Sequence, residues 1–228
     1  MCGRYNIAPD ARAWVTAWQI ARDLLTDLDW QASYNITPSR WVPMIRATSG
    51  GDGLVIDEAR WGFIPRWVKD EKPKLQPANT RSDSVAVKPY FRDSFKRRRC
   101  LFIASGYYEW ETVTGAKQPF HIRTTDGSPL LIAGIWDTWK GDDTAALITT
   151  DSNPQLAQIH DRMPLIVSKE QAEEWVYGDT PESFLKPHAD RLLDAYPISR
   201  AVNSPKNDDP SLIEPASIMG HIANINSE

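Results

Sequence analysis

Short apolar runs separated by turn-forming residues occupy the middle of the chain, and this pattern predicts β-strands. Between residues 100 and 150 the runs recur about every ten residues, a spacing typical of antiparallel strands joined by hairpins. Glycine-containing turns such as Thr114-Gly115 and Asp126-Gly127 separate the runs. We therefore predict an antiparallel meander that forms a curled, barrel-like sheet. Strands are expected at residues 42–46, 54–63, 100–104, 120–123, 130–136, 145–150 and 164–167.

Helical periodicity is limited to short segments. After Asp10, which can cap a helix, apolar side chains recur on one helical face and are expected to pack in the core: Trp14, Val15, Trp18, Ala21 and Leu25. Three more helices are predicted at residues 85–97, 153–160 and 168–177, the last with Ser168 as its N-cap. No linker, repeat or low-complexity segment divides the 228 residues. We therefore expect a single α+β domain over residues 1–228, with a largely antiparallel sheet, peripheral short helices and a tail that frays from about residue 220.

The composition narrows the class of protein. Hydrophobic residues make up 41% and charged residues 25% of the chain, as in ordinary globular proteins. No apolar run reaches the roughly 18 residues that a membrane helix needs, and the first residues lack the apolar core of a signal peptide. Two cysteines without an export signal indicate a reducing compartment, so we expect a cytoplasmic protein with free thiols. Four histidines without clustered Cys/His spacing predict no metal site, and we expect no cofactor.

The charge distribution leaves two interpretations open. The net charge of −4 argues against a nucleic-acid partner. Basic residues nevertheless gather in the first half of the chain, where Lys96, Arg97, Arg98 and Arg99 follow one another. This block is either part of a basic face for nucleic acid or a solvated helix end.

Cys2 follows directly on Met1, and cysteine is small enough that an initiator methionine is normally removed in front of it. The trimmed chain would carry an α-amine and a thiol on one residue. With an intrinsic pKa near 8, about a tenth of such an amine is unprotonated at neutral pH. The amine can condense with an aldehyde to an imine, and the thiol can then close a thiazolidine ring. The alternative interpretation is an incidental cysteine at a disordered chain end.

Four polar stretches stand out from the strand pattern. They are Asn79-Thr80-Arg81-Ser82-Asp83, Gly106-Tyr107-Tyr108-Glu109-Trp110, Ile159-His160-Asp161-Arg162-Met163-Pro164 and Ser199-Arg200-Ala201-Val202-Asn203. In the second, a carboxylate ends an apolar strand among aromatic residues. In the third, a titratable imidazole lies beside both an acid and a base.

Each stretch has a structural interpretation beside a functional one. Glu109 is either a solvated carboxylate at a strand end or an acid whose pKa is raised by its aromatic neighbours. His160 can act as an acid–base group or stabilise a helix end. Asn79 can occupy a turn or contribute to a site, and Arg162 can simply pair with a neighbouring carboxylate. Cys100, by contrast, is expected to be a packed strand residue.

Together with three further motifs, these stretches resemble one known family. The chain resembles the SOS-response-associated peptidase (SRAP) family of abasic-site-processing proteins from Cys2 to about Asn207. Seven short motifs in one order carry this resemblance more specifically than any single motif. The three further motifs are Met1-Cys2-Gly3-Arg4-Tyr5, Tyr34-Asn35-Ile36-Thr37-Pro38 and Trp61-Gly62-Phe63-Ile64-Pro65.

The resemblance implies a fold, a reaction and a set of active-site residues. The implied fold is α+β, built on a curled and largely antiparallel sheet. Cys2 would become the mature N-terminus and form a thiazolidine crosslink to the ring-opened abasic sugar in single-stranded DNA. Asn79, Glu109 and His160 match the remaining active-site positions. The implied partner is therefore single-stranded DNA with abasic sites, bound by a monomer that associates with the nucleoid.

Contacts to the DNA strand can be assigned on the same basis. Arg4, Arg81 and Arg162 are candidates for bidentate contacts to phosphates, and Asn35 lies in a matching motif. Trp67 can stack on a base. Many relatives have two adjacent aromatic residues at this point, whereas here Trp67 is followed by valine, which puts a two-ring wedge in doubt.

Two other functions stay open at this stage. The first is an N-terminal-nucleophile thiol peptidase or amidohydrolase in which Cys2, His160 and Glu109 act without forming a DNA crosslink. The second is a single-strand binding module without chemistry, which would be indifferent to Cys2. Removal of Met1 could be self-cleavage or the work of an aminopeptidase.

Overall fold

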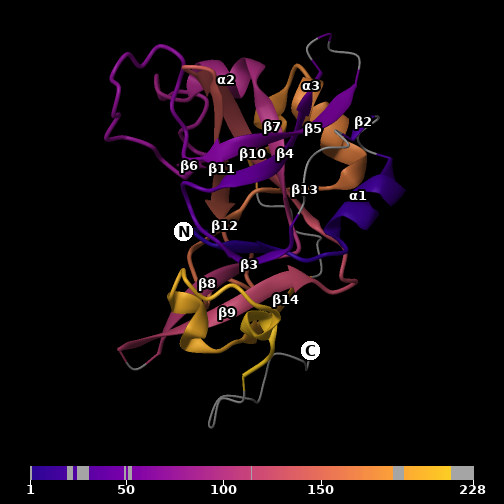
Figure 1. Cartoon of the computed structure of the whole chain (residues 1–228), viewed down its shortest axis with the longest axis vertical. Helices are drawn as coiled ribbons and strands as arrows, with labels where there is room; N and C mark the ends of the chain where they lie inside the picture. The colour runs from indigo at the N-terminus through magenta and orange to yellow at the C-terminus, as the bar shows by residue number, and fades with distance from the viewer. Residues whose placement is uncertain are drawn as a thin grey trace.

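The computed structural model describes residues 2–19, 23–24, 31–48, 50, 53–113, 115–186 and 193–216. Within these residues the strands form two sheets, the larger in the upper half and the smaller in the lower half of Figure 1. The smaller sheet has five strands in the order β14 (Leu193–Pro197), β9 (Ala116–Thr124), β8 (Gly106–Val113), β1 (Tyr5–Ile7) and β3 (Ser33–Ile36).

The larger sheet closes on itself. Its path runs β12 (Arg162–Pro164), β11 (Asp142–Asp151), β10 (Leu130–Trp139), β7 (Arg99–Ala104), β4 (Trp41–Ala47), β5 (Leu54–Trp61) and β2 (Asp23–Leu24). Because β11 also pairs in parallel with β5, the strands from β11 to β5 form a closed ring. Two short strands join at the side, β6 (Asn79–Arg81) on β11 and β13 (Ile166–Val167) on β10. The predicted curled, largely antiparallel α+β architecture is confirmed.

The predicted single meander from residue 100 to 150 is wrong. Strands β7, β10 and β11 are antiparallel neighbours in the larger sheet, as expected. The β8–β9 hairpin between them leaves that sheet, because β8 pairs with β1 in the smaller one. The regular ten-residue spacing therefore predicted β7, β9, β10 and β11, but not β8 as a separate strand and not the sheet to which each strand belongs.

The helices are shorter than predicted. Helix α1 (Ala11–Trp18) begins after Asp10 in the N-cap position and ends at Gln19, which is left-handed at φ 53°. The continuation toward Leu25 is wrong at β2, while the placements of Ala21 and Leu25 lie outside the described residues. Helix α2 (Arg92–Arg97) keeps only the last six residues of the segment predicted at 85–97. Proline at 89 explains this shortening, since it disfavours helix at the residue before it.

Two more segments were predicted as helices. Residues 153–160 form successive turns instead, and the Asn153 side chain accepts a hydrogen bond from the Leu156 N–H at 2.9 Å. This bond caps the first turn only, and a segment this short does not sustain a regular helix by itself. The segment at 168–177 is confirmed as a 3-10 turn, η1 (Lys169–Gln171), followed by α3 (Ala172–Tyr177), with Ser168 as the N-cap. The remaining 3-10 helices are η2 (Pro181–Phe184), η3 (Arg200–Asn203) and η4 (Pro210–Ile213).

One buried cluster draws on both sheets. The Trp61 ring in β5 packs against Tyr5 of the smaller sheet, with 5.1 Å between ring centroids, and against Phe102 of the larger one at 6.5 Å. Trp14 and Trp18 of α1 are only half-buried, although Trp18 packs on this core as expected. The single-domain organisation stays a prediction, which the shared core supports. None of the described helices is long and apolar enough to cross a membrane.

Candidate active site where the two sheets meet

The amino terminus enters the molecule where the two sheets meet (Figure 1). β1 pairs with β8 in a register that sets Tyr5 opposite Tyr107, and the Tyr108 N–H donates to the Arg4 carbonyl at 3.0 Å. Because the strands are antiparallel, the chain before Arg4 runs toward the residue after Tyr108. Cys2 therefore lies near Glu109. Cys2 is fully buried. Burial, with the nearby Glu109 charge as a second cause, raises the pKa of its thiol.

Asn79 holds the backbone of Cys2. Its strand β6 lies parallel to β11, with Asn79 opposite Leu147. From there the Asn79 amide Nδ2 donates to the Cys2 carbonyl oxygen at 2.7 Å. The other side-chain atom, Oδ1, is buried, and no donor among the described residues reaches it. An acceptor therefore lies beside the backbone of the residue that would carry the α-amine after trimming.

Trp61 supports this contact from below. Its indole Nε1 donates to the carbonyl oxygen of Ala78 at 2.8 Å, which fixes the residue directly before Asn79. The same ring packs on Tyr5 of the N-terminal strand. Trp61 therefore packs under the site and links the two segments that meet there.

Glu109 and His160 form a titratable pair beside Cys2. His160 Nε2 lies 4.0 Å from Glu109 Oε2. Glu109 is 3% exposed, and this burial raises the pKa of its carboxyl to about 7. Burial also lowers the pKa of His160. The functional interpretation of Glu109 as an acid with a raised pKa is the one that the geometry favours, because a pKa near neutrality suits proton transfer in both directions.

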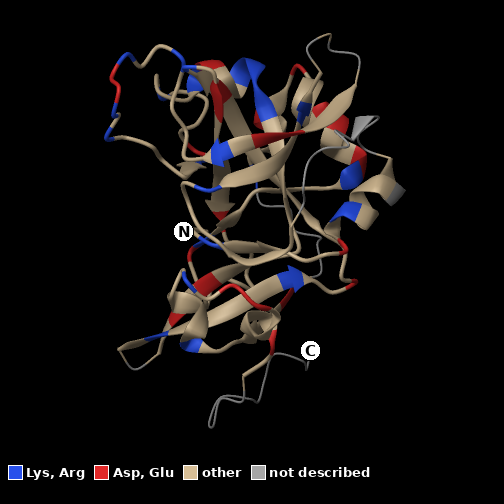
Figure 2. Cartoon of the chain, viewed as in Figure 1, with Lys and Arg blue, Asp and Glu red and all other residues tan. Residues whose placement is uncertain are grey.

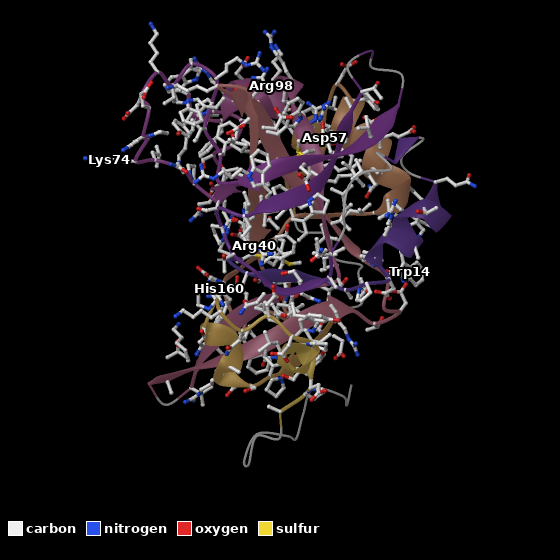
Figure 3. All side chains as sticks on the ribbon, in the orientation of Figure 1. Trp14, Arg40, Asp57, Lys74, Arg98 and His160 are labelled. Carbon is white, nitrogen blue, oxygen red and sulfur yellow. The ribbon has the colours of Figure 1, made fainter. Side chains whose placement is uncertain are left out.

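The tautomer of His160 follows from its second contact. Nδ1 accepts a hydrogen bond from the Arg162 backbone N–H at 3.0 Å, so in the neutral ring Nε2 carries the proton. That proton faces Glu109. The exposed carboxylate of Asp161 also lies 2.9 Å from Nδ1 and is positioned to bind the ring when it takes a second proton. Figure 3 labels His160 on the same side of the molecule as the amino terminus.

Two predicted DNA contacts are used inside the protein. Arg4 donates to the Asn35 side-chain oxygen at 2.9 Å and to the Val202 carbonyl oxygen. Asn35 is 1% exposed, so its geometry favours holding the chain over touching DNA. Its amide donates to the carbonyl oxygens of Val202, Ser204 and Asn207 at 3.2, 2.9 and 2.7 Å. The sequence left the role of the Ser199–Asn203 motif open. In the structure, the backbone of residues 202–207 accepts hydrogen bonds from Arg4 and Asn35 and so holds the amino-terminal strand; we call these contacts the clasp.

Arg162 is also internal. It is buried, and it donates to the Asp151 carboxylate at 2.6 Å and to the Thr149 carbonyl oxygen at 2.6 Å. These contacts tie β12 to β11 directly beside His160. The geometry therefore gives Arg162 a role in holding the histidine rather than an open phosphate contact.

Arg81 and Trp67 are exposed. Arg81 is held by Asp83 at 2.6 Å, and both side chains are open to solvent. Trp67 is 57% exposed and meets Tyr90 edge-on, with 5.7 Å between centroids. Tyr90 therefore supplies a second ring beside Trp67 from a distant part of the sequence, a neighbour that the motif comparison did not reveal.

Basic residues alternate with acidic ones over the part of the chain that the structure describes (Figure 2). The basic block at residues 96–99 spans the end of α2. Within it, Arg98 pairs with Asp93 and with the buried Asp137, and Arg99 donates to carbonyl oxygens such as that of Gly178. Half of this block is therefore structural, which favours the helix-end interpretation over a nucleic-acid face. Among the described residues, no group of three or more His, Cys, Asp or Glu side chains could hold a metal ion.

The chain is similar to known proteins over most of its length. Residues 1–205 match the model of the SOS response associated peptidase (SRAP) family. Abasic site processing protein YoqW of Bacillus subtilis is 32% identical, with 94% of this chain and 99% of that protein covered. Abasic site processing protein YedK of Escherichia coli is 30% identical, with 94% of this chain and 100% of that protein covered. Abasic site processing protein HMCES of Xenopus tropicalis is 31% identical, with 92% of this chain and 77% of that protein covered. A crystal structure from Bacteroides thetaiotaomicron superposes with a TM-score of 0.79 at 28% identity, covering 95% of this chain and 100% of that one.

Proposed function

Because this chain belongs to the SOS response associated peptidase (SRAP) family, we propose that it is a DNA-repair protein that processes abasic sites by linking itself covalently to them. Its relatives YoqW, YedK and HMCES are described as abasic site processing proteins. The observation that carries the proposal is the hydrogen bond from Asn79 to the Cys2 carbonyl beside the Glu109–His160 pair. This bond holds Cys2, which would carry the reactive amine and thiol, close to the acid–base pair.

The proposed reaction needs no reactant besides the lesion. The closed abasic sugar opens to an aldehyde, and the Cys2 amine adds to C1′ to give a carbinolamine. Loss of one water leaves an imine. The Cys2 sulfur then bonds to the same carbon, its proton passes to nitrogen, and a thiazolidine forms. Overall, aldehyde and aminothiol give thiazolidine and one water.

Each active-site residue has a role that suits its surroundings. Glu109, with a pKa near 7, exchanges protons with the sugar oxygens during ring opening. His160 directs the proton on Nε2 toward Glu109 and the departing water. Asn79 fixes the terminus through the Cys2 carbonyl, and its Oδ1 accepts a hydrogen bond from the attacking amine. Holding both reactants in this way replaces a bimolecular encounter with an oriented one.

A thiol hydrolase is the weaker candidate. A cysteine beside a histidine and a glutamate is the arrangement that such an enzyme would use. Reactive thiols, however, have a lowered pKa, whereas burial and Glu109 raise the pKa of the Cys2 thiol. The order amine first and thiol second suits a thiol that stays protonated until the imine has formed.

The proposed partner is single-stranded DNA bound by a monomer. An abasic nucleotide has no base to unstack, which lowers the cost of exposing the sugar. Arg81 and Trp67 are exposed and can contact a phosphate and a base. We further propose that Met1 is removed, by self-cleavage or by an aminopeptidase, before crosslinking, and that the protein works in the cytoplasm on nucleoid DNA.

Intact-mass analysis with an oligonucleotide that carries one abasic site tests the proposal. We expect one adduct, lighter by one water than the sum of protein without Met1 and DNA. Imine and thiazolidine have the same mass, so the adduct is then treated with methoxyamine, which captures an imine but leaves the ring intact. The wild-type adduct should persist.

Two cysteine variants and one insertion complete the test. Cys2→Ala keeps the α-amine, so its adduct should form only as an imine and disappear with methoxyamine. Cys100→Ala is the matched control, because this thiol is buried in β7, and its adduct should equal that of the wild type. An alanine inserted before Cys2 moves the α-amine to another residue than the thiol, so any adduct should again be an imine that methoxyamine removes. A Cys2→Ala adduct that survives methoxyamine would overturn the thiazolidine mechanism.

A further inference from the structure

Residues 62–78 connect β5 with β6 and carry the exposed Trp67 without forming a helix or strand. In Figure 3, Lys74 marks this connection at the edge of the molecule, on the side where His160 is labelled. A connection of this length without regular structure needs other bonds to hold one conformation. Three side chains at the ends of β10 and β11 supply such bonds, namely Asp137, Trp139 and Thr144.

These bonds hold alternate residues around Trp67, namely Ile64, Arg66 and Val68. Thr144 Oγ1 binds both the N–H and the carbonyl oxygen of Ile64, each at 3.0 Å. Asp137 accepts the Arg66 backbone N–H at 3.0 Å and its guanidinium Nε at 2.7 Å. Two residues further along the connection, the indole Nε1 of Trp139 donates to the Val68 carbonyl oxygen at 2.9 Å.

Strand geometry accounts for this spacing. Asp137 and Trp139 are two residues apart on β10, so their side chains leave the same face of the strand. They hold the residues on either side of Trp67, and the Trp67 side chain is left exposed. The far arm of the connection is held as well, since the Tyr90 hydroxyl donates to the Leu75 carbonyl oxygen at 2.7 Å.

We propose that Asp137 and Trp139 are positioning residues for the DNA strand, which they serve by fixing Trp67 for stacking on a base. The inference rests on the proposed function, since it takes single-stranded DNA as the ligand. A ring that is ordered before binding loses little conformational entropy when a base stacks on it. Asp137 is 1% exposed, so its carboxylate acts through Arg66 and does not touch DNA.

A double-mutant cycle on DNA affinity tests the inference. The probe is a fluorescently labelled single-stranded oligonucleotide without a lesion, so that crosslinking chemistry does not contribute to the measured Kd. Trp139→Phe keeps an aromatic ring but removes the indole N–H that binds the Val68 carbonyl, together with part of the ring volume. Trp175→Phe is the matched control, because it removes an equivalent N–H bond, 2.8 Å to the Cys100 carbonyl oxygen, inside the core.

We expect Trp139→Phe to weaken binding by about threefold to tenfold, the effect of one lost hydrogen bond on an ordered stacking group. Trp67→Ala should weaken binding at least as much. In the Trp67→Ala background, Trp139→Phe should have no further effect. Trp175→Phe should leave the Kd unchanged. Asp137→Asn should weaken binding in the same way as Trp139→Phe if it folds, and thermal unfolding reports on folding.

Limited trypsin digestion gives a second measurement. Lys69 and Lys74 lie in the connection, are exposed and are not followed by proline, so trypsin can cleave after them. Trp139→Phe should speed cleavage at these lysines, and Trp175→Phe should not. Unchanged binding and unchanged cleavage in Trp139→Phe would overturn the inference, and so would an equal loss of affinity with and without Trp67. If the wild type binds this DNA but forms no abasic adduct, the proposed function fails while the positioning role stands.

Discussion

Asn79 donates its side-chain amide to the Cys2 carbonyl oxygen at 2.7 Å, across 77 positions of the sequence. The bond joins the larger sheet, through β6, to the chain terminus that runs along the smaller sheet. It therefore fixes Cys2 relative to the larger sheet, which the amino-terminal strand does not belong to.

Replacing Asn79 should slow crosslinking more than it affects folding. Asn79→Ala removes both the anchor for the Cys2 carbonyl and the acceptor for its amine, and we expect a rate lower by about tenfold or more. Asn79→Asp keeps an acceptor oxygen at the same position and should lose less. Single-turnover crosslinking on abasic single-stranded DNA, followed on denaturing gels, measures both. A wild-type rate in Asn79→Ala would show that the terminus is positioned by other contacts.

Nothing in the local sequence distinguishes Asn79 from a turn residue, and this marks the limit of sequence reasoning here. The long strands of the larger sheet were predictable because each is a run of apolar or β-branched residues between turns, as in β10 and β11, whereas the short β2 and β6 were not predicted. β1, β3 and β14 are only three to five residues long, and their pairing depends on partners far away in the chain. The sheet that β8 joins depends on these partners.

The site shows the same division. The titratable residues Cys2, Glu109 and His160 could be chosen from chemistry and motif order. The burial of Asn35 and Arg162 could not, because a polar side chain in a motif gives no indication of which way it points. Those two residues make internal bonds where phosphate or DNA contacts were expected.

Glu109→Gln should stabilise the protein near neutral pH. Burial raises the folded-state pKa of this carboxyl to about 7, above its value in the unfolded chain. The folded state therefore holds the proton more tightly, and its advantage is fully present below the unfolded pKa and lost as the pH rises toward 7. The loss is on the order of 3 kcal/mol. A neutral glutamine avoids it.

Thermal unfolding of the two proteins at several pH values checks this sign. The melting temperature of Glu109→Gln should match or fall below that of the wild type near pH 4.5 and exceed it increasingly up to about pH 7. Crosslinking by the variant should meanwhile fall by about a hundredfold, the effect of a lost general acid–base group. A difference in melting temperature that does not change with pH would mean that the pKa of Glu109 is not raised.

Asn35→Ala should destabilise the whole fold. Its amide serves three carbonyl oxygens and its oxygen accepts from Arg4, all behind the amino-terminal strand. Leaving such groups without partners in the interior should lower the free energy of unfolding by about 2–4 kcal/mol. Urea denaturation measures the loss. Asn207→Ala is the control, since it removes a single exposed bond to the Ala201 carbonyl and should cost under about 1 kcal/mol. Equal losses would refute the clasp.

Gly106→Ala should disturb both stability and crosslinking. A Cβ at this position would overlap the His121 ring and lie 2.8 Å from the Ile122 carbonyl oxygen. His121 Nε2 is bonded to Asn6 Oδ1 at 2.9 Å, and Asn6 pairs with Gly106 in the register that sets the amino-terminal strand. Displacing the ring should lower the free energy of unfolding by about 3 kcal/mol and move the strand that carries Cys2.

Gly127→Ala is the control for backbone strain without a steric clash, because Gly127 has a φ of +76° but open space around it. We expect that control to lose about 1 kcal/mol in urea denaturation and to crosslink at the wild-type rate, whereas Gly106→Ala should crosslink more slowly even at temperatures where it is folded.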